Sequence, residues 1–344
     1  MMSGKINQII YGDSYKTLLQ LEKESVDLCY LDPPFFSNRI YETVSANGKI
    51  NSFEDKWDND LDKYIGYMRN VLLECHKVLK KTGSLYLHCD WHASHYLKIE
   101  LDNIFGRNNF RNEIIWRRHN AHNDTKQGAK ILGRVHDTIL FFSKSNEYTW
   151  NPIYEPYPDY YTKKYYKHIE PETGRKYAHG DLSGPGGKSK GNPQYSFLGV
   201  TRYWRFSKEN MEKLYQQGRI IQTSKGSVPI LKRYLDEMPG LMLQDMWNDI
   251  DSVQVTKKES VEYPTQKPIK LLERIIQISS NPKDLVLDPF CGSGTTLIAA
   301  VNLDRNYLGI DCNSQAVEIS RKRIRSRQMK PENMVIQKIS AKRK

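Results

Sequence analysis

The sequence predicts an α/β fold in which crossover helices cover a large, mainly parallel β-sheet. Two observations carry this prediction: apolar strand patterns alternate with helical patterns in residues 1–119, and the same alternation returns in residues 252–329. A third is the glycine-rich loop that directly follows a short apolar strand in the second stretch. With 344 residues, 38% of them hydrophobic, the chain has room for one large domain with an insertion, or for two domains.

The elements of the first stretch follow from the spacing of its apolar residues. In chain order they are a strand over 6–12, a helix through Leu18–Leu21, a strand over 26–31, a helix over 61–80, a strand ending at 88–90, a helix around 92–104 and a strand over 113–118. The helix over 61–80 shows the periodicity best, because its apolar residues recur on one helical face: Ile65, Met68, Val71, Leu72, Cys75, Val78 and Leu79. Residues 1–119 are therefore expected to form one half of the sheet domain.

The second stretch repeats the alternation in a shorter form. It predicts a helix over 265–280, a buried strand over 284–290, a tight loop over 291–296, a helix over 295–303, a strand over 306–311 and a helix that begins near 314. Residues 252–329 are expected to form the other half of the domain. The basic tail, residues 330–344, is expected to be frayed.

Residues 120–251 differ in composition from both flanks. They are dense in tyrosine and lysine, and residues 183–194 form a Gly/Pro/Ser/Lys loop that is unsuited to a hydrophobic core. The chain also carries a net charge of +12, which suggests a polyanionic partner such as nucleic acid but does not establish one. We therefore expect an inserted region with a role of its own.

Several classes of protein are disfavoured by what the sequence lacks. The five cysteines are scattered and include no CxxC pair, so neither a disulfide framework nor a zinc site is expected. We find no signal peptide and no apolar run long enough to span a bilayer. The sequence therefore predicts a cytoplasmic protein with no membrane partner and no metal.

The segment 286–296, VLDPFCGSGTT, has the order strand, acid, glycine loop, helix. Gly292 and Gly294 lack side chains and so allow backbone amides to approach a ligand. Asp311 ends the next strand, where a carboxylate can accept both ribose hydroxyls of a nucleoside. NAD and ATP fit poorly, because the third glycine of a dinucleotide loop and the Gly-Lys-Ser/Thr of a phosphate loop are missing. A structural turn remains the alternative, since a lone GxG is common.

The strand over 26–31 runs directly into Asp32-Pro33-Pro34-Phe35. This segment resembles the signature of amino-methyltransferases that act on the exocyclic nitrogen of adenine or cytosine. That nitrogen is a poor nucleophile, and hydrogen bonds to the Asp32 carboxylate and the Pro33 carbonyl stabilise the positive charge that it develops. Pro33 and Pro34 fix the backbone, and Phe35 offers a flat face to a base that has left its helix. A turn that contains Pro-Pro by chance is the alternative.

Asp288-Pro289-Phe290, ahead of the glycines, resembles the first motif of S-adenosylmethionine-dependent methyltransferases. Because the catalytic motif here precedes the cofactor loop, the chain resembles the beta class of N6-adenine and N4-cytosine DNA methyltransferases, whose Rossmann-like sheet is circularly permuted. The resemblance implies S-adenosylmethionine as the cofactor and residues 120–251 as a target-recognition region. It also implies cofactor contacts at Asp13, Thr265, Lys267, Asp288, Phe290, Gly292, Ser293, Gly294, Thr295, Asp311 and Asn313.

By this resemblance the chain is expected to methylate N6 of adenine at specific sites in double-stranded DNA, by base flipping and direct in-line transfer. The leading Asp32 favours adenine, since N4-cytosine enzymes tend to begin the motif with serine. Three alternatives stay open: an N4-cytosine enzyme, an amino-methyltransferase for RNA or protein, and a nucleic-acid-binding protein with an inactive methyltransferase fold. A homodimer and a cognate restriction endonuclease are partners that the resemblance allows, in a prokaryotic or phage-encoded system.

Overall fold

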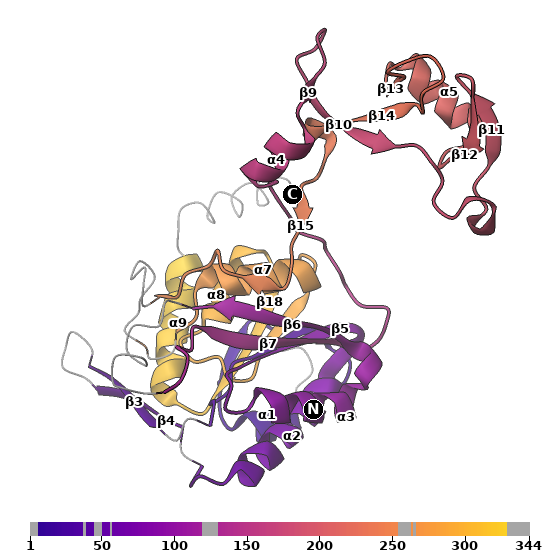
Figure 1. The fold of residues 1–344 in the computed structure, drawn as a ribbon. Helices are drawn as coiled ribbons and strands as arrows, with labels where there is room; N and C mark the ends of the chain where they lie inside the picture. The colour runs from indigo at the N-terminus through magenta and orange to yellow at the C-terminus, as the bar shows by residue number, and fades with distance from the viewer. Residues whose placement is uncertain are drawn as a thin grey trace, which may run out of the picture. The chain divides into compact units, whose positions relative to one another are not determined.

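The computed structural model describes residues 6–36, 39–44, 50–55, 57–118, 130–253, 263 and 266–328. The chain divides into two compact units (Figure 1). We call Met1–Pro152 together with Gln244–Lys344 the sheet unit, and Ile153–Leu243 the inserted unit. Two parts of the sequence interpretation, Thr265 and the tail 330–344, lie outside the described residues.

The sheet unit is built on eight strands in the order β1-β18-β17-β2-β5-β7-β6-β16. From β1 to β5 neighbouring strands are parallel, whereas β7 runs antiparallel to both β5 and β6. The strands are β1 (Gln8–Tyr11), β2 (Val26–Leu31), β5 (Leu79–Cys89), β6 (Phe110–Arg117), β7 (His136–Ser143), β16 (Met246–Trp247), β17 (Leu285–Asp288) and β18 (Asn306–Asp311). The predicted α/β class with a large sheet is confirmed.

Helices cover both faces of this sheet, with α1–α3 on one side and α7–α9 on the other (Figure 1). Their bounds are α1 (Ser14–Leu18), α2 (Leu61–Val78), α3 (Ser94–Phe105), α7 (Ile269–Ser279), α8 (Thr295–Asn302) and α9 (Ser314–Gln328). Helix α2 begins where Asp60 accepts a hydrogen bond from the Lys63 amide, and its apolar stripe is buried in the main core. A hairpin of β3 (Arg39–Val44) and β4 (Ile50–Asp55) pairs separately.

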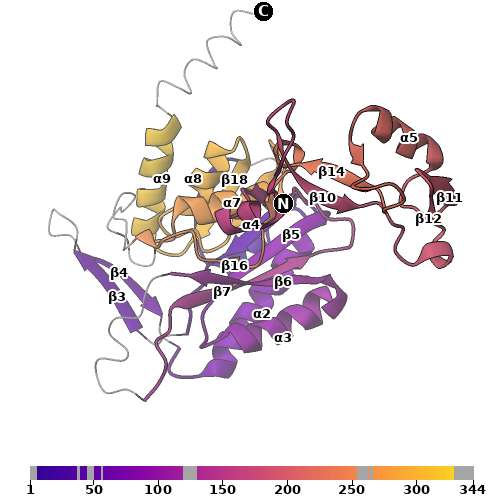
Figure 2. The ribbon, with the colours of Figure 1, turned by 45° about the horizontal axis from the view of Figure 1, so that its top comes forward.

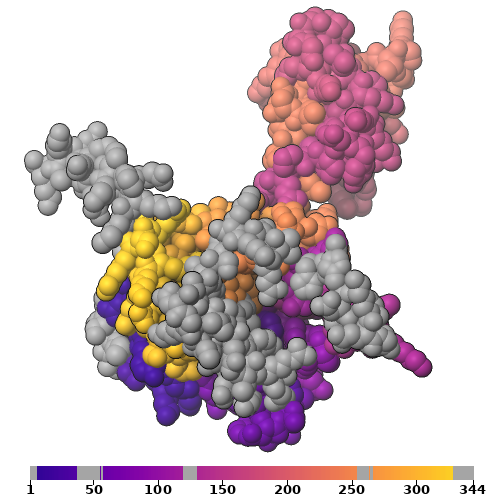
Figure 3. Space-filling model, turned by 90° about the vertical axis from the view of Figure 1, so that its left-hand side faces the viewer, coloured from indigo at the N-terminus to yellow at the C-terminus, as the bar shows by residue number. Residues whose placement is uncertain are grey.

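The two ends of the described chain meet in the same sheet. Strand β17 from the second stretch pairs in parallel with β2 from the first, with Leu287 opposite Cys29. Likewise β1 pairs with β18, and α9 packs on β1, so the C-terminal helix lies beside the N-terminal strand (Figure 3). This pairing places the strand before the glycine loop next to the strand before Asp32, as a permuted order of the motifs requires.

The inserted unit contains a four-stranded antiparallel sheet and a hairpin, which stand out in Figure 2. Its elements are β8 (Tyr154–Glu155), α4 (Asp159–Tyr165), β9 (His168–Ile169), β10 (Lys176–Asp181), β11 (Gln194–Phe197), β12 (Val200–Tyr203), α5 (Lys208–Gln216), β13 (Ile220–Ile221), β14 (Ile230–Tyr234) and β15 (Leu241–Met242). A small core of its own holds it together, made of Leu182, Phe197, Trp204, Met211 and Ile220. It is therefore a unit with an independent hydrophobic centre.

The boundaries of this unit differ from the expected region, residues 120–251. Strand β7 (His136–Ser143) falls in that region, yet it pairs with β5 and β6 in the main sheet, and so the inserted unit begins only at Ile153. The reason is burial, since Ile139, Leu140, Phe141 and Phe142 are all nearly inaccessible and complete the sheet's core. Among the described residues, no helix combines the length and apolar character needed to cross a membrane.

Candidate active site

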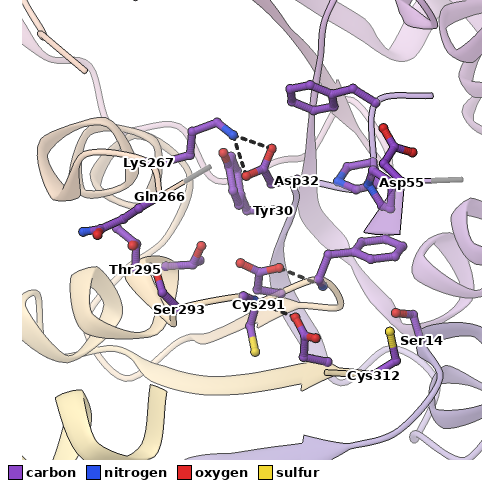
Figure 4. Close-up of a pocket in the computed structure, with 18 of the residues that line it drawn as sticks. Ser14, Tyr30, Asp32, Asp55, Gln266, Lys267, Cys291, Ser293, Thr295 and Cys312 are labelled. Carbon is purple, nitrogen blue, oxygen red and sulfur yellow. Dashed lines mark hydrogen bonds and ion pairs between the residues drawn. The ribbon is translucent and has the colours of Figure 1, made fainter. Parts of the chain in front are cut away.

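A cavity of about 340 Å³ opens at the carboxyl ends of the parallel strands (Figure 4). Because β1, β18, β17 and β2 run in one direction, the residues that follow them meet at one edge of the sheet. The volume lies in the range of small-molecule sites. The cavity wall includes most of the expected residues: Asp13, Asp32, Pro33, Pro34, Phe35, Lys267, Asp288, Phe290, Gly292, Ser293, Thr295 and Asp311. Residues from both ends of the sequence thus face the same space.

Asp288 ends β17 and is 2% exposed at the base of the cavity. Burial raises the pKa of its carboxyl to about 7, although hydrogen bonds from Thr296 and from the Phe290 amide oppose the rise. The nearby charges of Asp32 and Asp311 raise it further. With Asp13 and Asp55, five carboxyl groups thus line one cavity, which favours a ligand that carries positive charge.

Asp311 holds the glycine loop in place. One of its oxygens accepts a hydrogen bond of 2.7 Å from the Gly292 amide, and the other accepts one of 2.8 Å from the Asn313 amide. Burial nevertheless keeps the pKa of Asp311 above its usual value. The carboxylate that was expected to bind a ribose therefore also fixes the loop beside which that ribose would lie.

Two of the expected cofactor residues, Gly294 and Asn313, do not line the cavity in the part of the chain that the structure describes. Gly294 has a φ of +78° directly before α8, and a Cβ there would lie 2.7 Å from Ser320 Oγ on α9. Its lack of a side chain serves the turn and close helix packing rather than direct approach to a ligand. Asn313 directly precedes α9, and its Oδ1 accepts a hydrogen bond from the Gln315 amide in the first turn of that helix.

Asp32 is paired with Lys267, which comes from the segment just before α7. The Lys267 ammonium donates to both oxygens of Asp32, at 2.8 and 2.6 Å, and lies 5.0 Å from the centre of the Phe35 ring (Figure 4). Sequence reasoning placed Lys267 at the methionine end of a cofactor. The structure shows its contact with the carboxylate of Asp32, 235 residues away in sequence, and its contact with a cofactor stays a prediction.

The turn that follows Asp32 is held from the core side. Tyr64 on α2 donates a hydrogen bond of 2.8 Å to the Pro34 carbonyl. This carbonyl differs from that of Pro33, which the sequence interpretation assigns to the target base. A rigid turn of this kind positions acceptors before a ligand arrives.

Sequence reasoning missed several residues in the cavity wall, among them Tyr30, Asp55, Trp57, Tyr67, Tyr263 and Gln266. Tyr30 could have been predicted from the sequence, because side chains two apart on a strand share a face and Tyr30 precedes Asp32 by two residues. Tyr67 lies on α2, where it donates a hydrogen bond of 3.3 Å to Asp13. Only tertiary folding brings Tyr67 and Trp57 here, so no local pattern announces them.

The residues of this cavity fit a nucleoside with a positively charged end. Asp311 could accept hydrogen bonds from hydroxyl groups, Phe290 and Trp57 supply apolar contact, and Asp288 supplies negative charge. The ammonium of Lys267 is the complement for a carboxylate on the same ligand. In the described part of the chain, no group of three His, Cys, Asp or Glu side chains is arranged to hold a metal ion.

The chain is similar in sequence to a family of known proteins. A family model described as DNA methylase, N6_N4_Mtase, matches residues 26–322. The type II methyltransferase M.EcaI of Enterobacter cloacae is 31% identical over 315 residues, which cover 89% of this chain and 66% of that protein. The DNA adenine methyltransferase YhdJ of Escherichia coli K12 is 27% identical, with 92% and 82% covered. Among solved structures, the M1.HpyAVI–SAM complex aligns with a TM-score of 0.48 at 18% identity, covering 92% of this chain and 98% of that one.

Proposed function

This chain belongs to the N6/N4 family of DNA methylases, and from that premise we propose that it methylates N6 of adenine in duplex DNA. The observation that carries the proposal is the shared cavity, in which Asp32 of the catalytic motif and the glycine loop face one another. The choice of adenine rests on the leading Asp32 of the motif. The chain spans 66% of the length of M.EcaI, so a partner endonuclease and a recognition sequence are not inferred from that relative.

S-adenosylmethionine is the methyl donor of this family, and it supplies an electrophilic methyl group on a positively charged sulfur. In this chain Asp311 and the Gly292 loop would hold its nucleoside, while Asp288 and Lys267 would face its charged end. These residues bind and orient. They keep the donor beside Asp32, and the apolar wall of Phe290 and Trp57 limits the access of water.

Asp32 and the Pro33 carbonyl accept hydrogen bonds from the amino group of the target base. As N6 gains positive charge, the carboxylate stabilises it, and because Pro33 and Pro34 fix the turn, this costs little reorganisation. Lys267 already bonds to both Asp32 oxygens, but a carboxylate has about four acceptor positions in all. The base can therefore bond to Asp32 while the Lys267 ammonium stays. Phe35 supports the base from its face.

The direct test is nucleoside mass spectrometry of duplex DNA incubated with the purified protein and S-adenosylmethionine. The proposal expects N6-methyladenine as the product. If N4-methylcytosine is the only product, the chain is an N4-cytosine enzyme. If methyl groups are transferred only to RNA or protein, the substrate is not DNA. Binding of S-adenosylmethionine without transfer to any of these acceptors would indicate an inactive fold.

Asp288 makes cofactor binding depend on pH. Its pKa of about 7 means that the carboxyl holds a proton below that pH, and a cationic ligand favours the form without the proton. We expect the affinity for S-adenosylmethionine to rise as the pH goes from 5.5 to 7, by up to about tenfold per unit, and then to level off. Calorimetric titration measures this profile.

A matched pair of variants assigns this pH dependence. Asp288→Asn should flatten the profile, because the titrating group is gone. Asp284 also has a pKa raised by burial, but it lies at the amino end of β17, away from the cavity. Asp284→Asn should keep the wild-type slope. A slope that survives Asp288→Asn would assign the effect to another group.

We infer that the inserted unit binds the DNA target. Its hairpin β11–β12 and the adjoining turn carry four exposed cations: Lys188, Lys190, Arg202 and Arg205. Arg202 and Arg205 lie close together, since both donate hydrogen bonds to Ser183. Such a cluster suits contact with phosphates, which position DNA without reading its sequence.

The salt dependence of DNA binding tests this role. Replacing Lys188 and Lys190 together by alanine should reduce the slope of log affinity against log salt concentration by about 2, one unit for each lost phosphate contact. Lys81 is an exposed control at the amino end of β5, where it pairs with Glu147. Lys81→Ala should leave the slope unchanged. An unchanged slope in the double variant would show that Lys188 and Lys190 do not contact DNA phosphates.

A further inference from the structure

A chain of buried polar groups leads from the cavity wall, where Tyr30 lies, into the main sheet. Tyr30 Oη is 2.9 Å from His88 Nδ1, and His88 Nε2 is 3.0 Å from Asp137 Oδ2. Arg118 Nε lies 3.1 Å from the other Asp137 oxygen, as an ion pair without hydrogen-bond geometry. Tyr30, His88 and Asp137 are at most 1% exposed. Groups as polar as these are costly to bury, and they are retained only where each has a partner.

The sheet itself brings these residues together. Tyr30 is in β2, His88 in the adjacent β5, and Asp137 in β7, the next strand along. Burial raises the pKa of Tyr30 well above its usual value, so Tyr30 keeps its proton. Burial alone would raise the pKa of Asp137, but the His88 hydrogen bond and the Arg118 charge outweigh it and lower that pKa. A protonated Tyr30 then donates to His88 Nδ1, and His88 Nε2 donates to the Asp137 carboxylate.

His88 also supports the catalytic motif directly. The Phe35 ring stacks on the His88 ring, with centroids 5.8 Å apart and an interplanar angle of 22°. On another side, Trp116 meets the His88 ring edge-on at 5.6 Å, and Trp116 is itself fixed by a hydrogen bond to the Ile250 carbonyl. Phe35 lines the cavity, whereas His88 and Asp137 do not reach it within the described part of the chain. The His88 ring thus packs against Phe35 on the side away from the cavity, and hydrogen bonds to Tyr30 and Asp137 hold it in place.

We propose that His88, oriented by Tyr30 and Asp137, is a positioning residue that fixes the Phe35 face on which the target base rests. The inference rests on the proposed function and names a determinant of that same site. The His88 side chain is held by two hydrogen bonds and two rings, so it has one orientation. The Phe35 ring that stacks on it is therefore restricted as well. The network should therefore affect how productively the base is held, while the glycine loop and Asp311 continue to hold the cofactor.

Two variants keep the shape of these side chains and remove the polar groups that orient His88. Tyr30→Phe deletes one hydroxyl, and Asp137→Asn removes the charge that orients His88. A matched control exists in Tyr86, which stands opposite Tyr30 in the strand register, is equally buried, and bonds to Ser279 at 2.8 Å. Tyr86→Phe deletes the same kind of hydroxyl on the neighbouring strand, where that hydroxyl bonds to Ser279 and not to His88.

The measurement is kcat and KM for duplex DNA, with the dissociation constant for S-adenosylmethionine and the melting temperature taken in parallel. We expect Tyr30→Phe and Asp137→Asn to lower kcat/KM for DNA by about 10- to 100-fold, with cofactor affinity within about twofold of wild type. Tyr86→Phe should match wild type in kcat/KM.

Several results would overturn the inference. Wild-type kcat/KM in both variants would do so. A loss of kcat/KM that is explained by an equal loss of cofactor affinity would do so too. So would a loss of kcat/KM explained by a lower melting temperature, if Tyr86→Phe lowers the melting temperature and kcat/KM by the same amounts. A wild-type protein that transfers no methyl group refutes the proposed function instead. Wild-type methylation of cytosine refutes only the choice of base, and the comparison of variants is then made with that product.

Discussion

Asp32→Ala is expected to lower kcat for methyl transfer by at least about 10²- to 10³-fold, which is the effect of removing one group that stabilises developing charge. The binding of S-adenosylmethionine should be nearly unchanged, because in the proposed function Asp311 and the Gly292 loop hold the nucleoside, whereas Asp32 faces the target base. Single-turnover kinetics measures the first quantity and calorimetry the second. Turnover near the wild-type rate would refute the assignment of Asp32.

The Lys267 ion pair requires that stability be measured alongside. Removal of Asp32 leaves a largely buried ammonium without this partner, which is destabilising in its own right. Asp32→Asn is the gentler variant, since it keeps the shape and one oxygen but no charge, and its loss of kcat should be intermediate. The matched control is Glu100→Ala. Glu100 is buried in a two-bond ion pair with Arg69 between α3 and α2, so its loss should lower stability without lowering kcat.

The parts of the fold that sequence reasoning predicted well are those with a local cause. Strands β2 and β18 occupy the predicted residues, because each is an apolar run that ends in an acid or a turn. Helix α2 follows from its apolar spacing and from Asp60 before it. The order of the two motifs further implied that β17 and β2 lie side by side, and their pairing is observed. The cavity could be anticipated for this reason.

The parts that were missed depend on contacts between distant segments. Strand β7 has an apolar run as good as that of β2, but nothing local says that it returns to the main sheet. Without β7 in the sheet, Asp137 cannot be placed beside His88, and so the buried network was invisible from sequence. The Lys267–Asp32 pair has the same origin. Gly294 likewise contacts a distant residue, since a Cβ there would meet Ser320 on α9, while its predicted contact with the cofactor stays a prediction.

Gly294→Ala should therefore destabilise the protein as well as weaken cofactor binding. The residue has a φ of +78°, and an added Cβ would lie 2.7 Å from Ser320 Oγ and 3.2 Å from Ser320 Cα, which belongs to the backbone of α9 and cannot rotate away. A left-handed conformation costs an L-residue about 1–2 kcal/mol, and overpacking adds about 1–3 kcal/mol. We expect a loss of about 2–5 kcal/mol in unfolding free energy, measured by urea denaturation.

The same variant should also raise the dissociation constant for S-adenosylmethionine, because a shifted turn displaces the Gly292 amide from Asp311. Gly66→Ala is the control for the glycine substitution itself. Gly66 lies within α2, and a Cβ there meets nothing within 4 Å, so alanine should stabilise the helix by about 0.5–1 kcal/mol. Opposite signs for the two substitutions are thus the signature of a turn packed against α9. If Gly294→Ala were as stable as wild type and bound the cofactor equally well, the loop between β17 and α8 would have to adopt a different conformation in solution.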